Sequence, residues 1–88
     1  MCVILDGNLI SDRESLHDFL AGHLQFPGYY GRNLDALYDL LTEIQEETNL
    51  KIINADILRE TLGAYCAALI VTLNQASENN PHFSVEIC

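Results

Sequence analysis

Basic residues are scarce in this sequence. Four lysines and arginines stand against 13 aspartates and glutamates, giving a formal net charge of −9 at pH 7. Such a chain repels phosphate groups at long range, which argues against binding to nucleic acids. The imbalance suits a cationic partner, but many small cytoplasmic proteins are acidic only for solubility. On composition alone, solubility is the better explanation.

The sequence also lacks the segments that direct a chain to a membrane or a metal. No run approaches the roughly 20 apolar residues of a membrane span. The stretch 1–6 has neither the basic region nor the cleavage site of a signal peptide. Neither the three cysteines nor the three histidines have a metal-binding spacing. We therefore expect a cytoplasmic protein with reduced cysteines, no metal, no cofactor and no contact with a membrane.

The 88 residues, nearly half of them apolar, have the size and composition of a single domain spanning 1–88. Short apolar runs predict strands over 2–5 and 50–53. A third strand is predicted over 82–87, where Phe83, Val85 and Ile87 alternate with polar residues and should point inward.

Helical spacing of apolar residues fills the segments between these strands. Ser11 and Glu14 have the spacing of a capping box, followed by a core stripe that includes Phe19. Further helices are predicted over 33–47, from an Asp56 cap to Gly63, and over 64–77. Strands separated by helices predict an α/β fold, a small three-stranded parallel sheet covered mainly on one face by about four helices.

The helix predicted over 33–47 has two distinct faces. Asn33 is the expected N-cap. Leu34, Leu37, Leu41 and Ile44 recur at helical spacing and should face the core.

The other face of this helix is acidic. Asp35, Asp39 and Glu43 follow one another at intervals of four residues, and 33–47 contains no base. Like charges at this spacing repel each other by about a few tenths of a kcal/mol. A surface shaped only for stability would more often carry a lysine here. The pattern favours a surface that meets a positively charged group.

Tyrosines gather around the start of the same helix. Tyr29, Tyr30 and Tyr38 lie within ten residues, and Gly28 and Gly31 flank the first two. Tyrosine is enriched in interface hot spots, and glycines permit close approach of a partner to the loop backbone. The alternative is a solvated helix face with tyrosines packed at the helix start. The residues alone leave both explanations open.

Catalysis by this region is not expected. Asp35 and Asp39 could in principle act as a general acid and base. However, an exposed helix face offers no cleft to separate their pKa values. We therefore do not expect an enzyme.

The run 29–39, Tyr-Tyr-Gly-Arg-Asn-Leu-Asp-Ala-Leu-Tyr-Asp, resembles the signature of the barstar family, intracellular inhibitors of small secreted bacterial ribonucleases. The resemblance extends over the whole chain. It implies a barstar-like fold and a 1:1 complex in which loop and acidic helix plug the active site of a small, basic, guanyl-preferring ribonuclease and exclude RNA. By this resemblance Asp39 sits where a substrate phosphate would bind, and Asp35 pairs with the basic cleft.

The resemblance also implies roles for neighbouring residues. Tyr29 would pack on the nuclease's catalytic histidine, Gly31 and Asn33 would make close loop contacts, and Leu34 would be an apolar neighbour. We include Tyr30, Tyr38 and Glu43 in the expected contact surface.

Three positions depart from the family pattern. Tyr38 stands where barstar has tryptophan, and Ile44 lacks the aromatic character of its counterpart. Gln75 matches a position at which barstar has a glutamate that contacts the nuclease, so one charge pair would be lost. An immunity or regulatory module of the same fold, with a cationic target other than a ribonuclease, is the alternative to ribonuclease inhibition.

Overall fold

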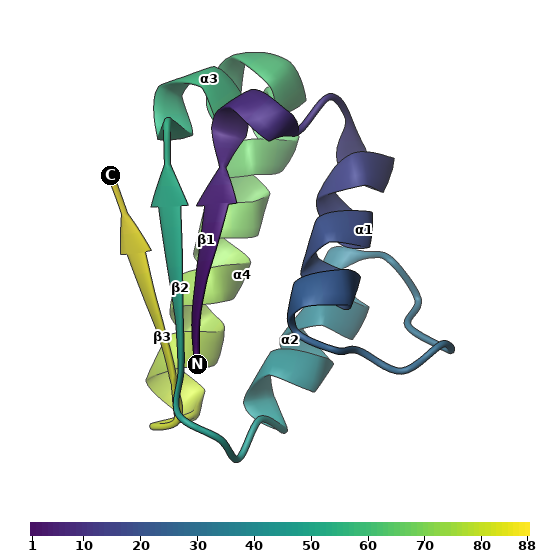
Figure 1. Ribbon diagram of the computed structural model, residues 1–88, viewed down its shortest axis with the longest axis vertical. Helices are drawn as coiled ribbons and strands as arrows, with labels where there is room; N and C mark the ends of the chain where they lie inside the picture. Colours follow the sequence, from purple (N-terminus) through teal and green to yellow (C-terminus); the bar gives the residue numbers. More distant parts are fainter.

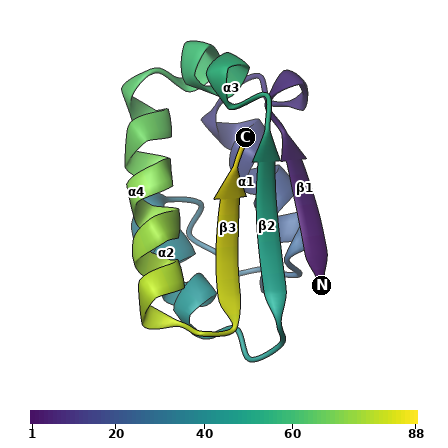
Figure 2. The same ribbon diagram turned by 90° about the vertical axis from the view of Figure 1, so that its left-hand side faces the viewer.

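The computed structural model describes residues 1–88 and consists of one sheet with helices packed against one of its faces (Figures 1 and 2). The elements in chain order are β1 (Cys2–Asp6), a 3₁₀ turn (Gly7–Leu9), α1 (Arg13–His23), α2 (Leu34–Thr42), β2 (Thr48–Ile53), α3 (Ala55–Leu62), α4 (Ala64–Asn79) and β3 (Phe83–Ile87).

The sheet confirms the predicted α/β class. Its three strands are parallel in the order β1-β2-β3, and Leu50 on β2 lies between Val3 on β1 and Val85 on β3. Parallel neighbours need long crossover connections, and the helices supply them. The sheet is covered on one side only, so one face of β1 stays open and Ile4 is 54% exposed.

Leucines form the centre of the core between the sheet and the helices. Leucine side chains from β1, β2, α1, α2 and α4 are completely buried, among them Leu5, Leu16, Leu20, Leu37, Leu41, Leu50 and Leu69. The period of 3.6 on the helices and of 2 on the strands brings these positions to one side. On α1, His17 is buried and the predicted stripe residue Phe19 is only half-buried.

Two helix starts differ from the prediction. At α1 the cap is Asp12, whose carboxylate accepts from the Ser15 amide at 2.8 Å, while the Asp12 amide donates to the Ser15 hydroxyl at 3.1 Å. The capping box is therefore shifted by one residue from Ser11. At α3 the cap position is Asn54, with a left-handed φ of 54° and no side-chain cap, so Asp56 falls inside the first turn.

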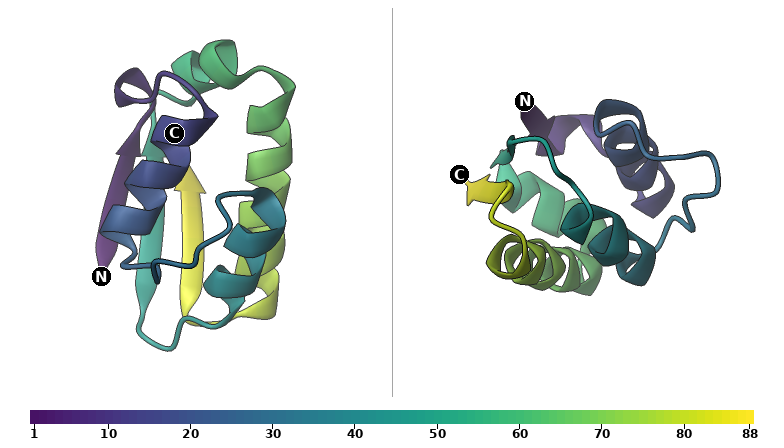
Figure 3. Two further views of the ribbon diagram at one scale, coloured as in Figure 1. Left: turned by 90° about the vertical axis from the view of Figure 1, so that its right-hand side faces the viewer. Right: turned by 90° about the horizontal axis from the view of Figure 1, so that it is seen from below.

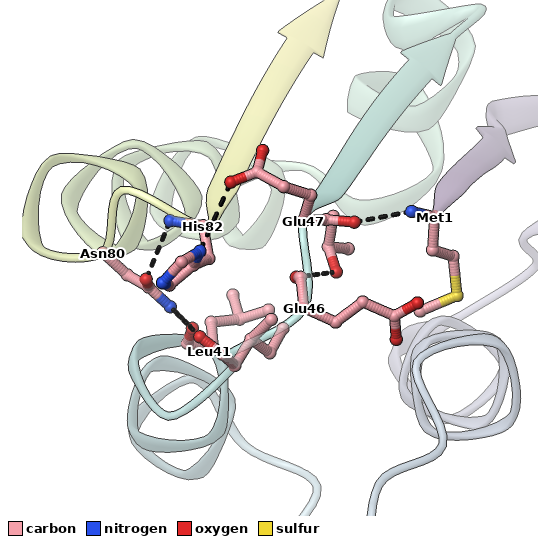
Figure 4. A network of polar contacts seen from close by, with 8 residues as sticks. Met1, Leu41, Glu46, Glu47, Asn80 and His82 are labelled. Atoms are coloured by element: carbon pink, nitrogen blue, oxygen red, sulfur yellow. Dashed lines mark hydrogen bonds and ion pairs between the residues drawn. The ribbon is translucent and has the colours of Figure 1, made fainter.

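The helix predicted to end near residue 47 ends at Thr42. Asn80, from the far end of the chain, donates to the carbonyls of Leu41 at 2.8 Å and Ile44 at 2.9 Å (Figure 4). These carbonyls are therefore satisfied without another helical turn. Glu47 continues toward the sheet, where its carbonyl accepts from the Met1 amino group at 2.5 Å.

The last strand is less buried than its alternation predicts. Phe83 is buried, Val85 is half-buried, and Ile87 is 36% exposed at the sheet edge. Gly63 does adopt the expected positive φ, at 60°, between α3 and α4. These differences leave the layers unchanged.

Candidate partner-binding surface

The loop between α1 and α2 projects from the body of the protein and leads directly into the acidic helix (Figures 1 and 3). A turn forms in it where the Tyr30 amide donates to the Pro27 carbonyl at 3.0 Å. The Phe26 and Tyr30 rings then pack 4.9 Å apart. These contacts fix the loop between the two helices.

Tyr30 anchors this loop to His17 of α1, and His17 in turn contacts Tyr65 of α4. Its hydroxyl lies 2.5 Å from His17 Nδ1, and the other ring nitrogen of His17 lies 2.7 Å from the Tyr65 hydroxyl. Burial raises the pKa of Tyr30, with a smaller effect from Tyr65. Burial, and secondarily the Arg32 charge, lower the pKa of His17. The neutral forms of both residues are thus favoured in the fold.

Neighbouring Tyr29 lies in a different environment from Tyr30. Its side chain is 83% exposed, whereas Tyr30 is 8% exposed. Of the three tyrosines predicted to contact a partner, Tyr29 is exposed, Tyr38 is half-buried, and Tyr30 is buried and supports the loop. A Cβ at Gly31 would lie 3.2 Å from Asn33 Nδ2 and 3.3 Å from the Ala36 side chain, so a larger residue would have to displace one of them slightly.

The acidic face of α2 is exposed and unpaired. Asn33 caps the helix by accepting from the Ala36 amide at 2.8 Å, as predicted. Two residues later, in the first turn, begins the acid ridge, which we define as Asp35, Asp39 and Glu43. All three side chains are exposed, and none has a hydrogen bond or ion pair within the protein. Glu43 lies at the C-cap because the helix ends early.

Beside this ridge, a surface hollow of about 400 Å³ lies where α2 and α4 meet. Gln75 and Thr72 of α4 line one side, and Asp35, Asp39, Leu34 and Tyr38 of α2 line the other. The Tyr38 hydroxyl accepts from Asn79 at 2.8 Å, which ties the two helices together. The structure therefore brings Gln75, distant in sequence, to the same hollow as both aspartates.

A second hollow lies on the opposite side of the ridge, between α2 and the loop. It is lined by Tyr29, Tyr30, Gly31, Ala36, Asp39, Leu40 and Glu43. Asp39 lines both hollows, so it occupies the centre of this surface. Small-molecule pockets are mostly apolar and convergent. Two shallow hollows around an exposed carboxylate fit the side chains of a protein partner better.

Sequence reasoning missed a third hollow, at the N-terminal end of α2. Arg13, Arg32 and Tyr65 line it together with Asn33, Leu34 and Asp35. The guanidinium of Arg13 lies over the Tyr65 ring, 4.2 Å from its centroid, and Arg32 forms an ion pair with Asp18. Arg13 and His17 are four residues apart, which places them on the same face of α1. That spacing is the local signal that could have connected this face with the loop.

The structure shows no group of three or more histidines, cysteines, aspartates or glutamates arranged to hold a metal ion. None of its helices combines the length and the apolar character needed to cross a membrane.

Comparison with known proteins gives a consistent result. The family model described as Barstar (barnase inhibitor) matches residues 1–88. A protein of Bacillus subtilis (strain 168) named "Putative ribonuclease inhibitor YrdF" is 39% identical over 77 residues, which cover 86% of this chain and 85% of that protein. A match over the full length of the chain shows the family, and this protein belongs to the Barstar family.

Proposed function

We propose that this protein inhibits a small cationic ribonuclease by covering its active site with α2 and the preceding loop. The observation that carries the proposal is the acid ridge, three exposed carboxylates with no partner inside the protein. Family membership and the name of the Bacillus subtilis relative support a ribonuclease as the target.

The charges of α2 suit the active site of a nuclease. Such a site is built to hold phosphate oxygens, and a carboxylate presents similar negatively charged acceptors to the same arginine, lysine and histidine groups. Asp39, which lines the hollows on both sides of the ridge, would take the central phosphate position. Asp35 would pair with the basic cleft beside it.

Apolar contacts would surround these charges. Tyr29 offers a large exposed ring at the edge of the loop hollow, suited to stacking on a nuclease side chain. Across the other hollow, Gln75 offers a neutral hydrogen-bonding group. In this arrangement α2, rather than α4, supplies the charge for recognition.

The proposal includes the setting of the interaction. The inhibitor would act in the cytoplasm, bind one nuclease molecule, and protect the cell from a secreted guanyl-preferring enzyme. It would use no cofactor and catalyse no reaction. The interaction would be steered at long range, because a protein of charge −9 attracts a basic partner.

A titration tests this directly. Purified protein is added to barnase and to a panel of other small secreted ribonucleases, and cleavage of RNA is measured. We expect the activity of at least one enzyme to fall linearly to zero at one equivalent. Association should slow as salt rises, because salt screens the attraction. If every nuclease stays fully active with the protein in excess, the proposal is wrong.

A further inference from the structure

We propose that Arg13 and Arg32 form a cationic subsite beside the acid ridge, and that this subsite binds a carboxylate side chain at the rim of the partner's basic cleft. The inference rests on the proposed function, since it describes the same complex. Two of the chain's four bases line this one hollow, although they come from α1 and from the loop.

Each arginine makes an internal contact at this hollow. Arg13 lies over the Tyr65 ring, and Tyr65 is fixed by its contact with buried His17. Arg32 pairs with Asp18 and not with Asp35, although Asp35 lines the same hollow. Arg13 is ordered by the Tyr65 ring, and an ordered side chain loses less freedom when a partner binds.

The backbone conformation at Arg32 is one that arginine adopts less readily than glycine or asparagine does. Its φ is 56°, in the left-handed region where glycine or asparagine is accommodated at lower cost. The ion pair with Asp18 does not explain the arginine, because the two side chains are 46% and 57% exposed and such pairs contribute little. Residues kept in strained backbone conformations cluster at functional sites.

The mixture of charges in this hollow indicates what it binds. Asp35 stands beside the two arginines, so a multiply charged phosphate would meet both attraction and repulsion. A protein surface with one carboxylate next to a cationic cleft matches both signs at once. Such paired complementarity fixes the orientation of two surfaces and selects among partners.

Association and dissociation rates can distinguish a local contact at this subsite from an effect of the protein's net charge. The variant Arg13→Gln/Arg32→Gln is two charges more negative than −9, so attraction to a cationic nuclease should speed its association. A local subsite predicts the opposite effect on the bound state. We expect dissociation from the best-inhibited ribonuclease of the panel to be about tenfold faster.

Three controls isolate the contact with the partner. Arg13→Lys/Arg32→Lys keeps both charges and should restore slow dissociation in large part. Asp18→Asn removes the internal partner of Arg32 and one negative charge, so association should slow slightly while dissociation stays unchanged. Arg32→Gly should raise the melting temperature by relieving the left-handed backbone, yet speed dissociation, which a purely structural role would not do.

The outcomes are decisive for each claim. If wild type inhibits a ribonuclease and the double glutamine variant dissociates at the same rate, the subsite is wrong and the proposed function stands. If Asp18→Asn speeds dissociation as much as the double glutamine variant does, Arg32 only tethers the loop and the subsite is again wrong. If wild type inhibits none of the ribonucleases, both proposals fail.

Discussion

The two faces of α2 carry opposite chemistry on the same nine residues. Leu37 and Leu41 are completely buried in the core, where α2 packs beside α4, whereas Asp35 and Asp39 are exposed and have no partner. Packing explains why the helix lies where it does, because the leucine face buries apolar surface. Nothing in the fold explains the acidic face. The difference shows which residues serve the structure and which are available for a partner.

Contacts at both ends and along one side fix the position of α2. Asn33 caps the first turn, Asn80 binds carbonyls at the other end, and Tyr38 is tied to Asn79 of α4. A helix fixed at both ends presents its carboxylates at constant positions. Preorganisation of this kind reduces the entropy lost on binding.

The largest effect on the free energy of unfolding should come from the leucine face. Leu37→Ala removes a side chain with no exposure and leaves a cavity, which should cost about 2–5 kcal/mol. Leu40→Ala, at a half-buried position that lines the loop hollow, is the matched control and should cost clearly less. Urea denaturation measures both. Equal losses would show that the core face of α2 is wrongly assigned.

The largest effect on inhibition should come from the acidic face. Asp39→Ala should weaken binding to the nuclease by about 2 kcal/mol or more, roughly 30-fold, as at interface hot spots, for which this family is itself a standard example. The free energy of unfolding should hardly change, since Asp39 makes no side-chain contact within the protein.

Glu78→Ala is the matched control for Asp39→Ala, because it removes one exposed carboxylate from α4 and changes the net charge equally. Titration of the nuclease with each variant compares them. Equal loss of inhibition would mean that net charge alone matters and that the binding face lies elsewhere.

Local patterns in the sequence were enough to predict much of the fold and the acidic face of α2. Strand alternation, helical spacing and the Asn33 cap depend on neighbouring residues, so the parallel sheet and the start of α2 could be predicted. Asp35 and Asp39 followed from the same spacing. The end of α2 could not be predicted, because it depends on Asn80, 38 residues beyond the helix end at Thr42.

The features of the site that were missed depend on contacts between distant segments. Tyr30 is buried because His17 and Tyr65 converge on the loop from two helices. Arg13 and Arg32 share a hollow for the same reason. Tyr30 and His17 look like surface residues in sequence, and their structural role comes from the contacts that join Tyr30 to His17 and His17 to Tyr65.

The smallest expected effect is a pH dependence of the free energy of unfolding that comes from His17. Burial first, and the Arg32 charge second, lower the pKa of His17 below its ordinary 6.5, so the unfolded chain binds a proton at this residue more readily than the folded protein does. Stability should therefore be highest above about pH 6.5 and fall as pH drops from there toward the lower pKa of the folded state. Urea denaturation between pH 7 and 5.5 measures this slope before most carboxylates titrate.

Two variants test the cause of this slope. His17→Gln retains a donor and an acceptor for Tyr30 and Tyr65 but does not titrate, so its free energy of unfolding should be nearly constant over this range. Arg32→Gln removes the secondary cause and should make the slope shallower without abolishing it, because burial is the larger effect. An undiminished slope in His17→Gln would place the titrating group elsewhere. A loss of the whole slope in Arg32→Gln would mean that the arginine, rather than burial, keeps His17 neutral.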